Sequence, residues 1–351
     1  MNIVMFRVLA TFSVFGLGCQ SQHALSAGAT PSPSPPMKAS PTPNPTQTLA
    51  RSLFRPLAQP VLARPELVDL GRMLYYDTRL SRSGTISCNS CHSLSHYGVD
   101  NRRTSVGDRG QHGGRNSPTV YHAFLHVAQF WDGRAKDVEA QAKGPMLNPV
   151  EMAMAGPEAV VQSLQAVPVY RQRFAAAFPK QKNPLNLDNV AVSIGAFERG
   201  LVTPSRFDRF LEGEADALSF GEQEGLKTFV QVGCASCHSG VGLGGDQYQK
   251  LGVRNAYATQ DTGRFQVTKD AHDRGVFKVP SLRNIARTGP YFHDGSVADL
   301  EEAIRLMGHH QLGVELTAEE IQKIKDFLAS AEGQIPQDYI RAPEIPPTEG
   351  P

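Results

Sequence analysis

Hydrophobic residues recur at the spacing of an amphipathic α-helix in several parts of the chain. Capping boxes open two of the expected helices, Ser219 with Glu222 and Thr317 with Glu320. The apolar faces are formed by Val190, Ile194, Phe197 and Leu201, by Leu226, Phe229 and Val230, by Leu300, Ile304 and Met307, and by Ile321, Ile324 and Leu328. We expect Gly308 to end the third of these helices. Strand-type alternation is scarce, so the sequence predicts a mainly α-helical fold with long Gly-rich or Pro-rich loops.

Residues 1–19 have the pattern of an export signal. Arg7 precedes an apolar run that is too short to span a bilayer. The run ends in Gly16-Leu17-Gly18-Cys19, which is similar to a lipoprotein signal except that Gly16 stands where a large aliphatic residue is usual. Two interpretations stay open, lipid attachment at Cys19 and ordinary signal-peptide cleavage nearby.

Residues 20–50 are rich in Pro, Ser and Thr, a composition that cannot bury a core. We interpret them as a disordered tether; a plain disordered tail is the alternative. The remaining length is enough for two domains, expected at 51–212 and 213–351, with the last residues free to pack back on the first domain. The net charge of +1 favours neither nucleic acid nor an anionic membrane surface as a partner.

The chain contains Cys-x-x-Cys-His twice, at residues 88–92 and 234–238. Two thiols at this spacing can add to the two vinyl groups of one porphyrin, and the next histidine gives the iron its proximal ligand. The motifs therefore predict two covalent c-type haems, bound by Cys88, Cys91 and His92 and by Cys234, Cys237 and His238. A zinc ribbon and a thioredoxin-like redox pair fit less well, because neither needs a histidine after each pair. Of the five cysteines only Cys19 is left, so no disulfide framework is expected.

A second repeat follows each haem motif. Phe-x-Asp-Gly and then Asp-x-Glu occur at Phe130 to Glu139 and again at Phe292 to Glu301, and Pro118 and Pro280 precede them at the same distance. Two related domains are the economical explanation. Met307 lies on an apolar helix face in the second domain, where a methionine is either part of the core or a haem ligand.

Longer segments make a family resemblance specific. The sequence resembles bacterial di-haem cytochrome c peroxidases at Asn116-Ser117-Pro118-Thr119, Ala128-Gln129-Phe130-Trp131-Asp132-Gly133-Arg134-Ala135, Asn148-Pro149-Val150-Glu151-Met152, Pro280-Ser281-Leu282-Arg283-Asn284-Ile285, Pro290-Tyr291-Phe292-His293-Asp294-Gly295 and Gln311-Leu312-Gly313. The resemblance implies two cytochrome c-like haem domains in tandem, the first peroxidatic and the second for electron transfer. It also implies reduction of hydrogen peroxide to water in the periplasm, with electrons from a small c-type cytochrome or cupredoxin.

The same resemblance assigns roles to single residues. Met307 matches the distal ligand of the electron-transfer haem, and Trp131 matches the indole between the haems. Glu151 matches the distal acid/base, which the cleavage of an O–O bond requires, and Gln141 a neighbouring polar residue. Asn116, Thr288 and Pro290 match a calcium site between the domains. A calcium-dependent homodimer is implied as well.

One position departs from the family pattern. Asp108 stands where classical members carry a distal histidine that blocks the peroxidatic haem until reduction, so this enzyme is expected to need no reductive activation. His112 is an alternative ligand, and His96, His122 and His126 are weaker candidates. Two other functions stay open: a relative that oxidises a protein side chain, which Met307 argues against, and a di-haem electron carrier without peroxidase activity.

Overall fold

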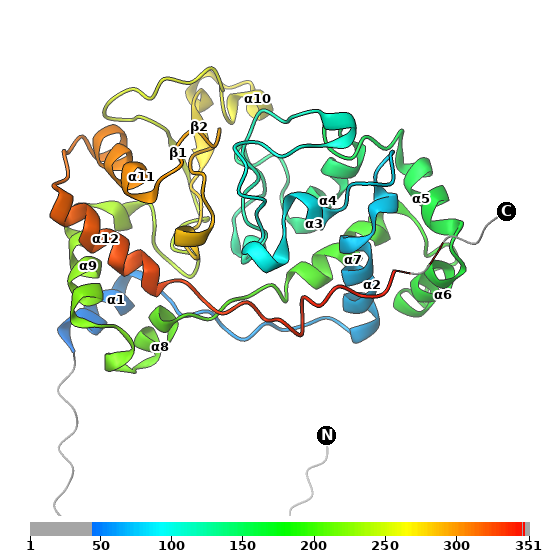
Figure 1. Cartoon of the computed structure of the whole chain (residues 1–351), viewed down its shortest axis with the longest axis horizontal. Helices are drawn as coiled ribbons and strands as arrows, with labels where there is room; N and C mark the ends of the chain where they lie inside the picture. The colour runs from blue at the N-terminus through cyan, green and yellow to red at the C-terminus, as the bar shows by residue number, and fades with distance from the viewer. Residues whose placement is uncertain (1–43, 346, 348–351) are drawn as a thin grey trace, which may run out of the picture. The chain divides into compact units, whose positions relative to one another are not determined.

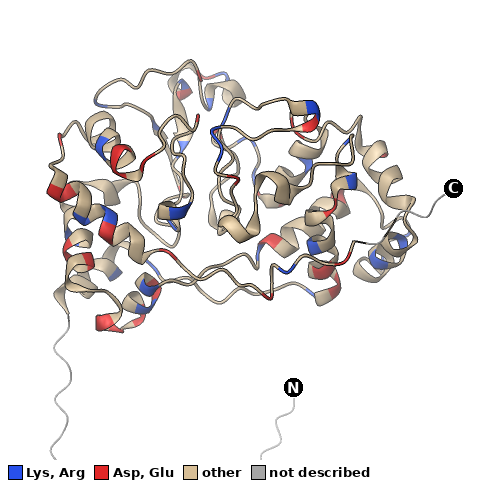
Figure 2. Cartoon of the chain, viewed as in Figure 1, with Lys and Arg blue, Asp and Glu red and all other residues tan. Residues whose placement is uncertain are grey.

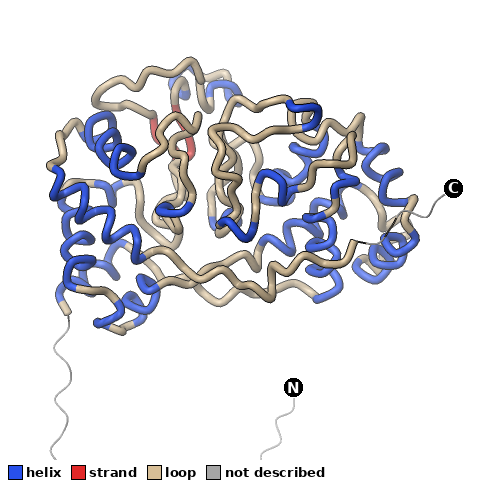
Figure 3. The backbone as a smooth tube through the Cα atoms, in the orientation of Figure 1, coloured by secondary structure: helices blue, strands red, loops and turns tan. Residues whose placement is uncertain are grey.

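The computed structural model describes residues 44–345 and 347; the expected signal, most of the expected tether and Cys19 lie outside this range. The helices in it are α1 (Pro45–Leu53), α2 (Pro65–Tyr76), α3 (Cys88–Cys91), α4 (Val138–Leu147), α5 (Pro157–Gln165), α6 (Pro168–Ala177), α7 (Leu187–Glu198), α8 (Arg206–Glu212), α9 (Phe220–Gln231), α10 (Phe265–Thr268), α11 (Leu300–Met307) and α12 (Ala318–Ser330). Long loops join them (Figure 3). The prediction of a mainly α-helical fold is confirmed.

The sheet in the described part of the chain is a single short hairpin. Strands β1 (Tyr248–Lys250) and β2 (Val276–Lys278) pair antiparallel, with Tyr248 opposite Lys278.

The helices themselves begin where their capping residues predict. Ser219 accepts a hydrogen bond from the backbone of Glu222 at the start of α9, and Thr317 does the same for Glu320 at the start of α12.

Two large hydrophobic clusters and a small third one, Phe292, Val297 and Ala303, form the interior of the described part of the chain. The first is built around α2, α4, α5, α6 and α7, and it buries Val190, Ile194, Phe197 and Leu201 as predicted. The second is built around α1, α8, α9, α11 and α12 and buries Leu226, Ile304, Ile324 and Leu328. In Figure 1, α2 lies against α7 and α9 lies against α12.

These two helix pairs pack in the same way. A Cβ atom on Gly71 of α2 would lie 1.8 Å from the carbonyl oxygen of Ser193 and 3.0 Å from Cβ of Phe197. A Cβ atom on Gly225 of α9 would lie 2.0 Å from the carbonyl oxygen of Lys323, and 3.0 Å from Cβ of Phe327. Only glycine allows this close approach of two helix backbones.

The repeated loops also share their backbone conformation. Phe130 and Phe292 both have positive φ, 66° and 68°. Each loop closes with an isolated antiparallel bridge, Gln129 to Ala135 in the first and Tyr291 to Val297 in the second. Asp137 and Asp299 then cap α4 and α11 with their side chains. The sequence repeat is therefore a repeat of local structure.

The structure corrects two of the expected boundaries. Helix α1 begins at Pro45, inside the stretch expected to be a tether, and Ala50 and Phe54 are fully buried in the second cluster. Phe207 of α8 belongs to the same cluster, although residues up to 212 were expected in the first domain. Distant contacts decide both points, since the Phe54 ring packs edge-on against Phe207. At the other end, Ile340 packs in the first cluster.

The segment after α11 also differs from the prediction. Gly308 does not end the helical path but begins a π-helical segment, Gly308–Leu312, which stops at Gly313 with φ 71°. Single π-helical turns are common at functional sites.

Charged residues of both signs are interspersed over the described helices (Figure 2), as the near-zero net charge suggests. No described helix has the length and apolar character needed to cross a membrane.

Candidate active site

The first haem motif forms the short helix α3. Ser87 caps it, and His92 follows directly. The Nδ1 atom of His92 lies 3.3 Å from the carbonyl oxygen of Gly98, and the Tyr75 hydroxyl donates to the carbonyl oxygen of His92 at 2.7 Å. Burial lowers the pKa of His92, which keeps the ring neutral. A neutral ring that donates from Nδ1 presents the Nε2 lone pair to a metal.

The second motif has the same arrangement in a 3₁₀ turn, Cys234–Ser236. The Nδ1 atom of His238 lies 3.3 Å from the carbonyl oxygen of Leu243. Burial lowers the pKa of His238 to about 4. Burial also raises the pKa of Cys234 to about 12. In the described part of the chain none of the four motif cysteines forms a disulfide, so all four sulfurs are left for attachment to a porphyrin.

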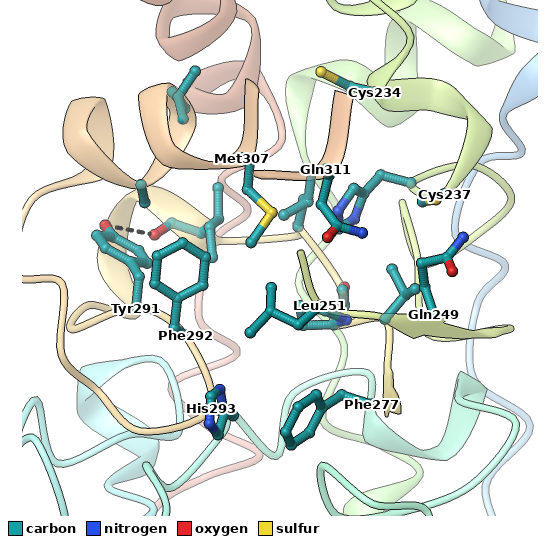
Figure 4. Close-up of a pocket in the computed structure, with 18 of the residues that line it drawn as sticks. Cys234, Cys237, Gln249, Leu251, Phe277, Tyr291, Phe292, His293, Met307 and Gln311 are labelled. Carbon is teal, nitrogen blue, oxygen red and sulfur yellow. Dashed lines mark hydrogen bonds between the residues drawn. The ribbon is translucent and has the colours of Figure 1, made fainter. Parts of the chain in front are cut away.

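A cavity of about 230 Å³ adjoins the second motif. Cys234, Cys237 and His238 lie on its wall together with Met307 from the end of α11. Figure 4 shows the Met307 thioether directed into this space, among Leu251, Phe277 and Phe292. A His/Met c-type haem needs two thiols for covalent attachment, an imidazole and a thioether as iron ligands, and apolar walls around the porphyrin. The residues therefore fit the group that the sequence predicts.

Trp131 lines the same cavity. Its Nε1 donates to the carbonyl oxygen of Asn116 at 2.9 Å, and its own carbonyl oxygen accepts from the backbone nitrogen of Lys278 at 2.8 Å. The indole is thus tied to a loop that follows the first motif, and the Trp131 backbone is tied to the second hairpin strand. The position is compatible with the bridging role that the resemblance implies.

Glu151 lies in the loop after α4, near the first motif. Asn148 donates from Nδ2 to Glu151 Oε1 at 2.7 Å. Burial raises the pKa of Glu151, although the bond from Asn148 opposes this. The pKa of Cys91 is raised mainly by burial and then by the nearby carboxylates of Asp100 and Glu151. Gln141 lies half-buried on α4, and within the described residues its side chain makes no hydrogen bond.

The loop that carries Asp108 packs against the Glu151 loop. The backbone nitrogen of Asp108 donates to the carbonyl oxygen of Glu151 at 2.6 Å. Oδ1 of Asp108 accepts from the backbone nitrogen of Ser83 at 3.1 Å, and its side chain is buried. A Cβ atom on Gly107 would lie 2.1 Å from the carbonyl oxygen of Val150, so the two loops meet at a glycine. Asp108 is thus brought next to Glu151.

The histidine candidates are dispersed. His112 is exposed, and its Nδ1 lies 3.3 Å from Thr104 Oγ1. His96 is also exposed and contacts Ser93. His122 is buried and accepts from the backbone of Thr203, and burial lowers its pKa to about 3. His126 contacts Lys278 on the wall of the cavity.

The three expected calcium ligands, Asn116, Thr288 and Pro290, line the same cavity. The Asn116 amide nitrogen donates to the carbonyl oxygen of Arg102 at 2.9 Å, which leaves the amide oxygen to accept or coordinate. Within residues 44–345 and 347, no group of three or more His, Cys, Asp or Glu side chains could hold a metal ion. Amide and carbonyl oxygens are the ligands that this position offers.

Sequence reasoning missed the buried charges around the site. Lys278 is 6% exposed and Glu198 is 4% exposed, and Arg283 forms a fully buried ion pair with Asp208. A weak signal exists for Lys278, which stands between Phe277 and Val279. Glu198 similarly adjoins the apolar face of α7. In both places an ionisable side chain stands among apolar residues, which indicates that it is buried but does not identify its partner.

Comparisons with known proteins identify relatives of this chain. A family model described as di-haem cytochrome c peroxidase matches residues 65–216. Cytochrome c551 peroxidase of Nitrosomonas europaea is 44% identical over 302 residues, covering 85% of this chain and 89% of that protein. Cytochrome c551 peroxidase of Pseudomonas aeruginosa is 43% identical over 311 residues, covering 85% and 88%.

The family includes proteins with another role. Methylamine utilization protein MauG of Paracoccus denitrificans is 37% identical, covering 69% of this chain and 75% of that protein. The crystal structure of a MauG-like protein associated with microbial copper homeostasis superposes with a TM-score of 0.71 at 32% identity, covering 83% of this chain and 96% of that chain. The identity to the two cytochrome c551 peroxidases is higher, above 40% over most of their length. It belongs to the di-haem cytochrome c peroxidase family and is an enzyme of that class.

Proposed function

We propose that this chain reduces hydrogen peroxide to water in the periplasm, with electrons from a small c-type cytochrome or cupredoxin. One peroxide takes up two electrons and two protons and gives two waters. The observation that carries the proposal is the difference between the two halves: Glu151, oriented by Asn148, lies by the first motif, whereas Met307 faces the second. The supporting comparisons are the peroxidases at 43–44% identity.

The chain holds two covalent haems, one at Cys88, Cys91 and His92 and one at Cys234, Cys237, His238 and Met307. When bound, they supply stored electrons and the metal at which the peroxide bond is cleaved. Glu151 takes a proton from one peroxide oxygen and returns it to the other, which a carboxyl with a raised pKa does near neutral pH. Trp131 offers an aromatic path between the two motifs, and Gln141 assists in the pocket around Glu151.

The loop that carries Asp108 bears on whether the first haem is open to peroxide in the oxidised enzyme. Asp108 is held inward by Ser83 and by the backbone of Glu151, and a carboxylate there does not replace the histidine that blocks other family members. His112 is exposed and bonded to Thr104. We therefore include in the proposal that the oxidised enzyme is active without prior reduction.

The remaining parts of the proposal rest mainly on the resemblance and, for Cys19, on the N-terminal signal pattern. Asn116, Thr288 and Pro290 bind one Ca²⁺, and the active form is a homodimer. The two large hydrophobic clusters correspond to the two haem domains, the first peroxidatic and the second for electron transfer. Cys19 is the point of attachment if the chain is lipidated.

The test is hydrogen peroxide turnover with a reduced small cytochrome as donor. Fully oxidised enzyme is compared with enzyme first reduced by one electron, each with calcium and with a chelator. Equal immediate rates support the whole proposal, and loss of rate with the chelator supports the calcium site. Activity only after reduction would contradict the open first haem. No activity in either state would leave the side-chain-oxidising and electron-carrier functions.

A further inference from the structure

Lys278 is a buried cation without an anionic partner among residues 44–345 and 347. It ends strand β2 and is 6% exposed. Its Nζ lies 3.2 Å from His126 Nδ1, and among the described residues no carboxylate forms an ion pair with it. Burial lowers its pKa to about 8. Buried charges in proteins are paired, because an isolated one costs several kcal/mol of desolvation.

The neighbouring His126 has a donor that lacks an acceptor. Because its Nδ1 accepts from the Lys278 ammonium, the ring proton belongs on Nε2. Nε2 is buried and makes no hydrogen bond within the described residues. The ring cannot move aside easily, since it lies against Gly245, where a Cβ atom would be 2.3 Å from His126 Cδ2. Two adjacent buried side chains therefore present donors with nothing to receive them.

Both side chains line the cavity that holds His238 and Met307. Among the described residues on its wall, Lys278 is the one Lys or Arg, and no Asp or Glu is present. The wall thus carries a positive charge that no described residue of the wall balances. The balancing anion must come from whatever fills the cavity.

We propose that Lys278 and His126 bind a propionate carboxylate of the haem attached at Cys234 and Cys237. A carboxylate has two oxygens, one for the Lys278 ammonium and one for the His126 Nε2 proton. The inference rests on the proposed occupancy of the second site by haem. A water molecule would satisfy the hydrogen bonds but would leave the charge unbalanced.

The pairing has a consequence for the redox potential. With Lys278 removed, the propionate charge stands uncompensated near the iron and favours the oxidised, more positive state. The potential of the second haem then falls. Exposed lysines do not have this effect, because solvent screens them.

The experiment compares Lys278→Gln with Lys250→Gln in the complete protein with both haems. Lys250 is exposed on the paired strand β1, so the control makes the same charge change outside the cavity. The midpoint potential of the second haem is measured by spectroelectrochemical titration, and the propionate bending mode by resonance Raman spectroscopy. Haem content by the pyridine haemochrome assay shows that both haems are attached.

We expect Lys278→Gln to lower the reduced-to-oxidised ratio at fixed potential about tenfold, equivalent to about 59 mV for one electron, and to shift the propionate mode. Lys278→Arg should restore both, and His126→Phe should shift the mode alone. If Lys278→Gln fails to incorporate haem, His126→Phe and Lys278→Arg carry the test. An unchanged propionate mode in Lys278→Gln or, if that variant lacks haem, in His126→Phe overturns the inference, even if the potential moves. A wild-type protein with one haem instead overturns the proposed cofactor assignment.

Discussion

The indole nitrogen of Trp131 donates a hydrogen bond to the carbonyl oxygen of Asn116 at 2.9 Å. The backbone nitrogen of Asn116 in turn donates to the carbonyl oxygen of His293 at 2.8 Å. Trp131 and His293 occupy the same position in the two repeated loops, each one residue after a phenylalanine with positive φ. Asn116 therefore joins the two copies of the repeat, and the indole is held by that junction.

Replacing Trp131 with Phe should slow peroxide turnover while both haems stay attached, because the ring that we propose as the path between the haems loses its size and its hydrogen bond. The lost bond to the buried Asn116 carbonyl should also lower the free energy of unfolding by about 1–3 kcal/mol. Stopped-flow mixing with peroxide follows electron transfer between the haems, and denaturant unfolding gives the stability. Unchanged electron transfer in a stably folded variant would exclude the indole as the path.

Replacing Glu151 with Gln should lower peroxide turnover by a factor of about 10²–10⁴, the usual contribution of a positioned acid/base. Gln keeps the shape and can still contact Asn148, but it cannot move a proton. Asn148→Ala should lose less activity, because it disturbs the orientation of Glu151 and leaves the carboxyl in place. Steady-state kinetics and absorption spectra of both haems are measured for each variant. Retained turnover in Glu151→Gln would remove Glu151 from the mechanism.

Met307→His should lower the midpoint potential of the second haem, since a methionine ligand raises it. The matched control is Met146→Leu, because Met146 is another buried methionine, located on α4 in the first cluster. Redox titration and the near-infrared ligand band of the oxidised protein are the measurements. Should the potential and the band be the same in Met307→His and in wild type, Met307 is a core residue and not a ligand.

The ion pair between Arg283 and Asp208 should be essential to stability. The two guanidinium Nη atoms lie 3.0 and 2.9 Å from the carboxylate oxygens, and Nε donates to the carbonyl oxygen of Val241. Arg283→Met leaves Asp208 buried and unpaired, so we expect a loss of about 3–5 kcal/mol in the free energy of unfolding.

The control for this pair is Arg305→Met, which breaks the exposed pair with Glu302 on α11. Exposed pairs contribute little, because water screens them. Chemical denaturation of both variants, with haem content checked, decides the matter. Equal stabilities of the two variants would contradict the prediction.

Glu198 should make the protein less stable as pH rises. Burial, followed by the charge of Glu139, raises the pKa of Glu198 from 4.5 to about 8. The folded protein then keeps the carboxyl neutral while the unfolded chain ionises it. Its contribution to stability is complete below pH 4.5 and is lost as pH rises to about 8.

Thermal unfolding of wild type and Glu198→Gln between pH 4.5 and 8.5 measures this contribution as a difference between the two proteins. We expect wild type to lose stability relative to the variant across the range. Glu158→Gln, an exposed carboxyl at the start of α5, is the control and should follow wild type. Parallel curves for wild type and Glu198→Gln would show that Glu198 ionises equally in both states.

Features that depend on neighbouring residues could be predicted from the sequence. The capping boxes at Ser219 and Thr317 begin helices as expected, because a cap and its partner are three residues apart. The Cys-x-x-Cys-His motifs carry their chemistry in five consecutive residues. The repeated Phe-x-Asp-Gly loops likewise fold alike because their turn residues are alike.

Features that depend on distant contacts were decided by the tertiary structure alone. Helix α1 belongs to the second cluster because Phe54 packs against Phe207, and no local pattern records that contact. Gly308 continues into a π-helical segment although glycine commonly ends a helix. The Lys278 and His126 pair joins residues 152 positions apart. Burial and charge pairing are properties of the assembled interior, so the sequence specifies the elements and motifs, whereas their mutual contacts specify the electrostatics of the site.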